Sequence, residues 1–445
     1  MIVDTRESPA ELRLWRPLLA TIVVLLPPLG LLTPPGTFWA ISLVIALFVL
    51  LFFSSKIAFR ASLALQWLVQ IEPPAVDLLT TGALLKRIFA AKHMQFFKPD
   101  LALLPFLLFS FVNILQLPFA SDSNRALLFG AITIYTTLLM PYIFSNIEQY
   151  AGNTWIKCLA ASMYITAVSL IVFGVLGLLG YKFYFPHFFD GIRPTAFFKD
   201  PNVAAPFVIF GALRYLTLYS LGQIQLKYFL PRFTLFLLAI LFTFSRGAFI
   251  NLFVGALFVI AVAITTKHVK RSLTIFAIVL LIFSISAVAA IALGQNRFLS
   301  INDYDTSGRL AAWISGLLVF HDYPFGVGPG QFESFSAQVQ IQELRNKYIT
   351  PSAHNVYIRV LVENGIEGLM LWLVGIMFVM IKGVRALITS YLIRNYSKLI
   401  GLLWSLSTLI GILVEGMVID ILHWRHLGMV IGLVLLYSRD SQKYV

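Results

Sequence analysis

The chain has 445 residues, of which 59% are hydrophobic, 14% aromatic and only 12% charged, and its mean hydropathy is +0.85. Soluble globular proteins are about 45–50% apolar and about 25% charged, so this composition excludes a set of soluble domains and predicts a protein that crosses a membrane several times. The net charge of +13 is compatible with nucleic-acid binding only if the basic residues gather on one surface. The single cysteine, Cys158, excludes an intramolecular disulfide.

Apolar windows of about 20 residues recur along the chain and predict about twelve transmembrane helices. Pro27 and Pro28 predict a kink in the first of them. No small-residue cleavage site follows this first apolar run, so we expect an uncleaved signal anchor. Ionisable residues between Glu415 and His426 interrupt the last pair of spans. The predicted spans are 17–34, 36–54, 100–120, 125–147, 155–180, 203–222, 229–245, 247–266, 272–294, 356–382, 398–416 and 420–438.

The distribution of basic residues orients this bundle. With the N-terminus inside and an even number of spans, about two thirds of the Lys and Arg residues fall on the cytoplasmic side, as the positive-inside rule requires. Topology and contact with anionic membrane lipid then explain most of the charge, so no nucleic-acid partner is expected. The sequence therefore predicts an all-α polytopic membrane protein whose N- and C-termini are both cytoplasmic.

Two longer insertions divide the predicted bundle. The stretch 55–99 is amphipathic and basic, which predicts a pair of interfacial helices on the cytoplasmic leaflet. The stretch 295–355 falls on the outer side and is long enough to cover a functional site. We therefore expect nine transmembrane helices within 1–294, one large outer loop over 295–355, and three further transmembrane helices within 356–445.

Polar clusters on the outer face are the strongest indication of function. Outer segments are normally poor in Lys and Arg, and ionisable groups at this level of a membrane are costly. Four clusters that are remote in sequence nevertheless fall on this face. They are Arg193-Pro194 with Lys199-Asp200-Pro201-Asn202, Ser245-Arg246-Gly247, Ser307-Gly308-Arg309 and His354-Asn355.

Arg246 is expected to bind an anion at the start of a helix. It follows Ser245, a good N-cap residue, and opens a helix whose first turn has partial positive charge. A cation is unfavourable there unless an anion binds, and helix N-termini are anion sites. Gly247 allows close approach of the backbone. The alternative is an arginine that extends to lipid headgroups.

His354 is a candidate general base. Ser352 is predicted to cap the next helix, which places His354 in the first turn. The helix dipole disfavours a protonated imidazole there, and a neutral ring is able to accept a proton. A continuous helix from His354 to Lys382 would rise about 42 Å, which puts the ring at headgroup height. The alternative is an interfacial histidine with a satisfied hydrogen bond.

Two further patterns suggest structural roles. Arg359, Glu363 and Glu367 recur at four-residue spacing, which predicts a polar stripe and a structural ion pair that faces the bundle interior. The glycine-rich run 325–330 neither follows a predicted strand nor contains the lysine of a phosphate loop. It therefore predicts a rigid turn and not a nucleotide site.

Together these residues resemble a known family. The run His354-Asn355, nine residues, Gly365, two residues, Gly368 resembles the signature of the O-antigen ligase family. Flanking pieces are similar to the wider superfamily of O-antigen ligases and polymerases, so that the resemblance covers roughly residues 190 to 370. These pieces are Arg193 with Pro201-Asn202, Ser245-Arg246-Gly247, Gly308-Arg309 with Trp313, and Pro324-Phe325-Gly326-Val327-Gly328.

The resemblance implies a GT-C-like glycosyltransferase with a lipid-linked donor, on the periplasmic side of a Gram-negative inner membrane. It would ligate O-antigen polysaccharide from undecaprenyl pyrophosphate onto a sugar hydroxyl of lipid A-core in lipopolysaccharide biosynthesis, with inversion at the anomeric carbon. The family is understood to need no metal, and no cofactor is expected. Asp303 and Asp305 have the spacing of a metal-binding carboxylate pair, but the resemblance argues against them as ligands.

Specific roles follow from the resemblance. His354 would deprotonate the acceptor hydroxyl, while Arg246 and Arg309 would hold the pyrophosphate and stabilise its leaving charge. The residues expected to bind substrate are Arg193, Asp200, Asn202 and Asn355.

Three alternatives would use the same outer residues. An O-antigen polymerase takes the same donor with a second lipid-linked glycan as acceptor, and a protein O-oligosaccharyltransferase glycosylates protein hydroxyls. A transporter of anions or lipid-linked glycans also lines its pathway with cationic groups. Such transporters usually have interrupted helices near the bilayer midplane, whereas these charges lie at one face.

Overall fold

The structure is a computed structural model. It describes residues 33–90, 100–266, 303–342, 349–350 and 352–439, together with 17, 20–22, 24–30, 269–271, 273–275 and 277–278. The predicted ninth span at 272–294 lies largely outside the described residues. The side chains of Asp303 and Asp305 are also outside them, and so are many of the basic residues that oriented the bundle, among them Arg6, Lys92 and Lys267.

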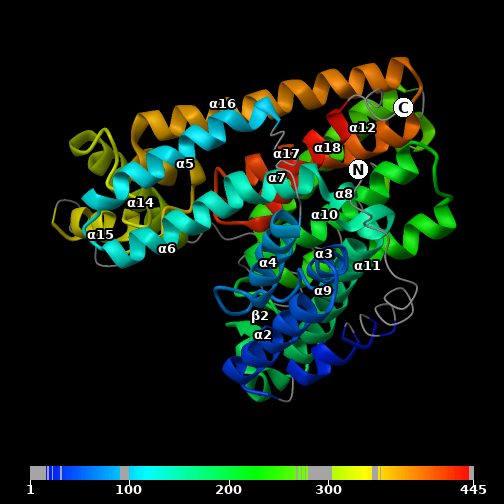
Figure 1. The fold of residues 1–445 in the computed structure, drawn as a ribbon, viewed down its shortest axis with the longest axis horizontal. Coiled ribbons are helices and arrows are strands. Elements are labelled where there is room, and N and C mark those ends of the chain that lie inside the picture. Colours follow the sequence, from blue (N-terminus) through cyan, green and yellow to red (C-terminus); the bar gives the residue numbers. More distant parts are fainter. Residues whose placement is uncertain are drawn as a thin grey trace. The chain divides into compact units, whose positions relative to one another are not determined.

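Helices make up nearly all of the described structure (Figure 1). The longer ones are α2 Pro35–Phe52, α3 Ser55–Ala64, α4 Ala75–Ala90, α5 Leu104–Gln116, α6 Ser123–Ile134, α9 Trp155–Leu178, α10 Pro201–Ser220, α11 Leu226–Thr243, α12 Arg246–Thr265, α14 Asp303–Asp322, α15 Phe332–Gln342, α16 Val356–Leu392, α17 Tyr396–Glu415 and α18 Arg425–Ser438. The short elements are α7 Met140–Ser145, α8 Ile147–Ala151, η1 Leu101–Leu103, η2 Leu117–Phe119, η3 Tyr135–Leu139, η4 Gly152–Thr154, η5 Tyr181–Tyr184, η6 Pro186–Phe188 and the paired strands β1 Phe189–Asp190 and β2 Arg193–Pro194.

The all-α polytopic fold predicted from composition is confirmed. Within the described residues, nine helical stretches are long and apolar enough to cross a membrane. Seven of them match a predicted span to within about three residues, whereas Ile147–Leu178 begins about eight residues before its predicted span and Val356–Leu392 ends about ten residues after its own. Of the other three expected spans, 17–34 contains the short apolar helix Ala20–Gly30 and 420–438 contains α18. The total of twelve therefore stays a prediction.

The helices form two compact units. The first comprises Met1–Lys98, Asn146–Ala212 and Leu230–Ser245. In its core lies α3, in which every residue from Ile57 to Ala64 is buried. The prediction of two interfacial helices over 55–99 is therefore wrong for α3, because a helix enclosed by protein presents no face to lipid headgroups.

The second unit comprises Pro99–Ser145, Leu213–Phe229 and Arg246–Val445. Within it α5 lies beside α16 and runs in the opposite direction (Figure 1). At one end of this pair the ammonium of Lys382 binds the carboxylate of Asp100. At the other end the Asn364 side chain donates hydrogen bonds to the side chains of Asn113 and Gln116, at 3.0 and 3.1 Å.

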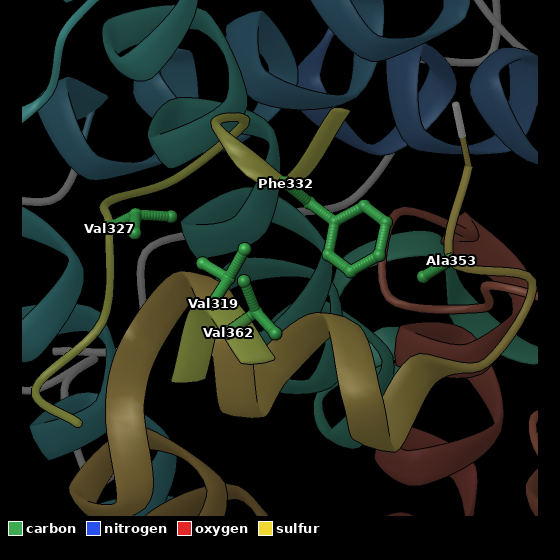
Figure 2. Packing of buried hydrophobic residues seen from close by; sticks show 5 residues of the cluster. All are labelled: Val319, Val327, Phe332, Ala353 and Val362. Atoms are coloured by element: carbon green, nitrogen blue, oxygen red, sulfur yellow. The ribbon is translucent and has the colours of Figure 1, made fainter. Parts of the chain in front are cut away.

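The stretch expected to be a large outer loop contains α14 and α15. These helices enclose a small hydrophobic core with the start of α16 (Figure 2). Ala353, directly before His354, contributes to this core and is fully buried. The core thus fixes the chain immediately ahead of the candidate base. Its buried members are Val319, Val327, Phe332, Ala353 and Val362.

α16 is broken at Gly365, whose φ of 71° and ψ of −174° lie outside the helical region. The glycine-rich turn fills the break and hydrogen-bonds the backbone groups on both sides of it, so that they are satisfied away from water. The run 325–330 forms a turn, as the sequence predicts. The bonds are Val327 N–H to Val362 O at 3.0 Å, Gly328 N–H to Glu363 O at 2.9 Å, and Ile366 N–H to Pro324 O at 3.2 Å.

This break corrects two predictions. The rise of about 42 Å between His354 and Lys382 assumed a continuous helix, but the helix changes direction just after Val362 (Figure 2). The polar stripe also ends at the break, because Glu367 beyond it is exposed while Arg359 and Glu363 before it are buried. The buried ion pair between Arg359 and Glu363 was predicted and is present, with the two side chains 3.2 Å apart.

We expect Gly326→Ala to destabilise the second unit. Gly326 has φ of 90°, and a Cβ there would lie 2.5 Å from the carbonyl oxygen of Glu363. A side chain in this backbone region costs about 1–3 kcal/mol before the clash is counted. The measurement is the midpoint of thermal unfolding in detergent. The matched control is Gly36→Ala, where a Cβ would meet nothing within 4 Å. Equal midpoints for the two variants would refute the close fit between turn and helix break.

Candidate active site

The three residues predicted to act in catalysis, Arg246, Arg309 and His354, all belong to the second unit. Each is half-buried, so that part of its surface is open to a ligand. The chain around each of them contacts one short segment, Glu415–Asp420, which ends α17 and leads towards α18. This segment, called here the connecting segment, is the feature that brings the three sequence-remote clusters together.

Arg309 lies in the second turn of α14 and donates from Nη1 to the carbonyl oxygen of Val418 at 3.3 Å. Its neighbour Gly308 faces Thr350, whose Oγ1 would lie 2.5 Å from a Cβ at that position. Thr350 in turn exchanges two backbone hydrogen bonds of 3.0 Å with the side chain of Gln340 on α15. These contacts fix α14 and α15 to the chain that leads to His354.

His354 stands just before α16 in a left-handed backbone conformation, with φ of 45°. Non-glycine residues rarely adopt this conformation, and where they do it is often at a functional site. The preceding residue, Ala353, is held by a hydrogen bond of 2.9 Å from the indole N–H of Trp313 on α14 to its carbonyl oxygen. The backbone on the N-terminal side of His354 is thereby anchored to the same helix that contains Arg309.

Asn355 caps α16. Its Oδ1 accepts hydrogen bonds from the backbone N–H groups of Tyr357 and Ile358, at 2.9 and 3.1 Å. The prediction that Ser352 is the cap is therefore wrong, and His354 precedes the helix instead of lying in its first turn. Ser352 and Asn355 are both residue types that cap helices well. Asn355 is favoured as the cap because its Nδ2 also donates to Met417 O of the connecting segment, at 3.1 Å.

Arg246 is the first residue of α12, as predicted. The next residue, Gly247, lies against the connecting segment: a Cβ on it would be 3.1 Å from Oε1 of Glu415 and 3.6 Å from a methyl carbon of Val418. Gly247 thus allows the start of α12 to approach this segment closely. The carbonyl of Val418 accepts from Arg309, so the starts of α12 and α14 meet at the same residue.

Sequence reasoning predicted the pair of Arg359 with Glu363 but missed the rest of the ion-pair network next to this site. The buried guanidinium of Arg359 contacts Glu333 of α15, Glu363 at 3.2 Å and Asp420 at 2.7 Å. Glu333 also pairs with Arg125 of α6 at 2.8 Å. Asp420 is the last residue of the connecting segment, so the network holds that segment to α15 and α16. The available signal was the group of ionisable residues between Glu415 and His426 inside an apolar region.

Arg193, in contrast, lies in the first unit, on β2. Its Nε donates to Thr243 O at 2.9 Å and its Nη2 donates to Oδ1 of Asn202 at 2.6 Å. Asp190 is 3.6 Å away, and Oδ1 of Asp200 accepts from Asn202 N–H at 2.7 Å. These three predicted substrate-binding residues, Arg193, Asp200 and Asn202, therefore form one hydrogen-bonded group at the start of α10. Their contact with substrate stays a prediction.

Comparison with protein families bears on this arrangement directly. A family model described as O-antigen ligase matches residues 233–373. The resemblance to O-antigen ligases is confirmed over this stretch. It includes Arg246, Arg309 and His354, whereas the resemblance around Arg193 and Asn202 lies outside it. No curated protein matches the chain.

Replacement of Arg359 by methionine should strongly destabilise the protein. The change leaves the carboxylates of Glu333, Glu363 and Asp420 without their shared cation, and breaking a buried ion pair costs about 3–5 kcal/mol. Thermal unfolding of the detergent-solubilised protein measures the effect. Arg394→Met, at an exposed position on the same chain, is the control and should leave the midpoint almost unchanged. A similar loss in both variants would show that the network adds nothing specific.

Proposed function

We propose that this protein ligates O-antigen polysaccharide from undecaprenyl pyrophosphate onto a sugar hydroxyl of lipid A-core. The family match supports a function of O-antigen ligase or polymerase type, and the apolar helices support a multi-pass membrane protein. We further propose that the protein resides in a Gram-negative inner membrane, with its active site at the periplasmic face. Both substrates are then anchored in the membrane and reach the site without leaving it.

The observation that supports this proposal is the convergence on the connecting segment. Arg309 binds its backbone directly, the cap next to His354 binds it through Asn355, and α12 begins against it after Arg246. The Arg309 side chain and the residues next to His354 and Arg246 thus contact one short piece of chain, which supports a role for all three in one site. Glycosyl transfer from a pyrophosphate donor requires a base to deprotonate the acceptor and cationic groups to stabilise the leaving pyrophosphate.

The chemistry follows from these groups. An imidazole nitrogen of His354 takes the proton of the acceptor hydroxyl as its oxygen attacks the anomeric carbon of the donor sugar. The bond between that carbon and the pyrophosphate oxygen breaks, and its electron pair leaves with undecaprenyl pyrophosphate. Arg246 and Arg309 stabilise the charge that develops there, since a guanidinium binds phosphate oxygens in a bidentate manner. Attack on the face opposite the leaving group inverts the anomeric centre.

The remaining predicted residues take supporting roles in the proposal. The Oδ1 of Asn355 accepts hydrogen bonds from the first turn of α16, and its Nδ2 donates to Met417 O. Both groups of this side chain are therefore occupied, and we assign it the role of positioning His354. Arg193, with Asn202 and Asp200, is proposed to contact the glycan or its phosphate. The mechanism assigns charge neutralisation to arginine and so requires no metal or cofactor.

A reconstituted assay tests the proposal. We expect purified protein to join undecaprenyl pyrophosphate-linked O-antigen to lipid A-core, and to give no elongated lipid-linked polymer when lipid A-core is left out. Product is measured by gel mobility and mass spectrometry. Polymer formed from lipid-linked glycan alone would identify a polymerase, and glycan on a protein acceptor would identify an O-oligosaccharyltransferase. Flux of anion or lipid-linked glycan without any transfer would favour a transporter.

His354→Asn should abolish transfer while the protein still folds. Asparagine tolerates the left-handed backbone conformation of this residue better than most side chains, but it removes the base. Loss of a general base typically lowers the rate about 10²–10⁴-fold. The control is His321→Asn, because His321 lies on α14 and its side chain is 86% exposed. Transfer by His354→Asn at more than about a tenth of the wild-type rate would exclude His354 as the base.

A further inference from the structure

A second candidate site lies in the same unit, at the opposite end of the long part of α16. It is a cavity of about 590 Å³ between α16, η1 and the adjoining ends of α17 and α18. Its lining contains both basic and apolar side chains. The residues that matter for its chemistry are Asp100, Leu101, Phe378, Lys382, Arg385 and Lys398.

The depth of this cavity follows from helix geometry. Arg385 is 20 residues beyond the break at Gly365, a rise of about 30 Å along one helical segment. This equals the thickness of the hydrocarbon core of a bilayer. We therefore expect the cavity at headgroup level on the face opposite the helix break. By the predicted topology this is the cytoplasmic face, where membranes are rich in anionic lipid.

The charges around the cavity favour an anion. Lys382 is neutralised by Asp100, and Lys398 donates from Nζ to the carbonyl oxygen of Arg439 at 2.8 Å. The exposed guanidinium of Arg385 has no hydrogen-bond or ion-pair partner among the described residues. Among the described lining residues, three cations against one carboxylate leave a net positive charge. A guanidinium with free donors is suited to bind phosphate.

The apolar residues in the cavity lining indicate which kind of anion binds. Leu101 is 83% exposed and Phe378 is 44% exposed, and both line the cavity beside the cations. Ile381 is a third exposed apolar side chain on the same lining. A free inorganic anion gains nothing from such a surface, whereas the acyl chains of a lipid gain from covering it.

We propose that this cavity binds the phosphate of an anionic phospholipid, with an acyl chain against Leu101 and Phe378. Arg385 supplies the main contact to the headgroup, and Lys398 and Lys382 add positive charge around it. The lipid fills the cavity between α16 and the ends of α17 and α18 and so stabilises their packing. This site is independent of glycan transfer, because none of its residues belongs to the candidate active site.

The test is a titration of the detergent-solubilised full chain with dioctanoyl phosphatidylglycerol, with the thermal unfolding midpoint as readout. We expect wild type to be stabilised in a saturable manner, and the apparent affinity of Arg385→Gln to be about fivefold weaker. Arg394→Gln is the matched control, since Arg394 is exposed at the same end of α16 but does not line the cavity. It should behave as wild type. Without lipid, all three proteins should unfold at similar temperatures.

Three outcomes would overturn the proposal. Equal weakening in Arg385→Gln and Arg394→Gln would show a diffuse effect of surface charge. Equal stabilisation by dioctanoyl phosphatidylcholine would show that the cavity does not select net negative charge. Saturation by inorganic phosphate at the same concentrations would assign the site to a free anion instead of a lipid.

Discussion

The structure of the second unit depends on the satisfaction of backbone hydrogen bonds where α16 is interrupted. A helix that breaks inside a membrane protein exposes carbonyl and amide groups that lipid cannot bind. Here the turn between α14 and α15 supplies the missing partners for Val362, Glu363 and Ile366. The break and the turn are therefore one structural element, and α14 and α15 owe their position to it.

Buried ion pairs of Arg359 stabilise the same element. Arg359 lies in the short part of α16 before the break and holds carboxylates from α15, from its own helix and from the connecting segment. Because the ion pairs are buried, each partner is needed to offset the desolvation of the others. The connecting segment then presents its carbonyl groups to Arg309 and Asn355. The candidate active site therefore depends on the position of the connecting segment, which depends in turn on the ion pairs of Arg359 and on the helix break beside them.

Much of this arrangement was predictable from sequence, and the exceptions have a common cause. Hydropathy located nine spans, and residue type located the start of α12 at Arg246 and the ion pair of Arg359 with Glu363. These are local properties of the chain. Local patterns do not reveal that Glu333 and Asp420 complete the network, since they are remote in sequence.

Three further predictions failed for the same reason. Ser352 and Asn355 are equally good caps by type, and the contact of Asn355 with Met417 decides between them. Glycine at position 365 is compatible with a helix, and only the turn packed against it favours the break. Burial of α3 likewise results from neighbours that its amphipathic composition does not identify. Residue types thus indicated the candidate residues, while long-range contacts determined how those residues are arranged.

The consecutive carbonyls of Gly416, Met417 and Val418 receive hydrogen bonds from the start of α16, from Asn355 and from Arg309. A displacement of this one strip of backbone would move Arg309 and the residue next to His354 at the same time. Under the proposed function, evolution would have little freedom to alter donor affinity and acceptor activation one at a time through this strip. If the protein transfers glycans as proposed, adaptation to a different glycan is more accessible at surfaces that do not share this strip.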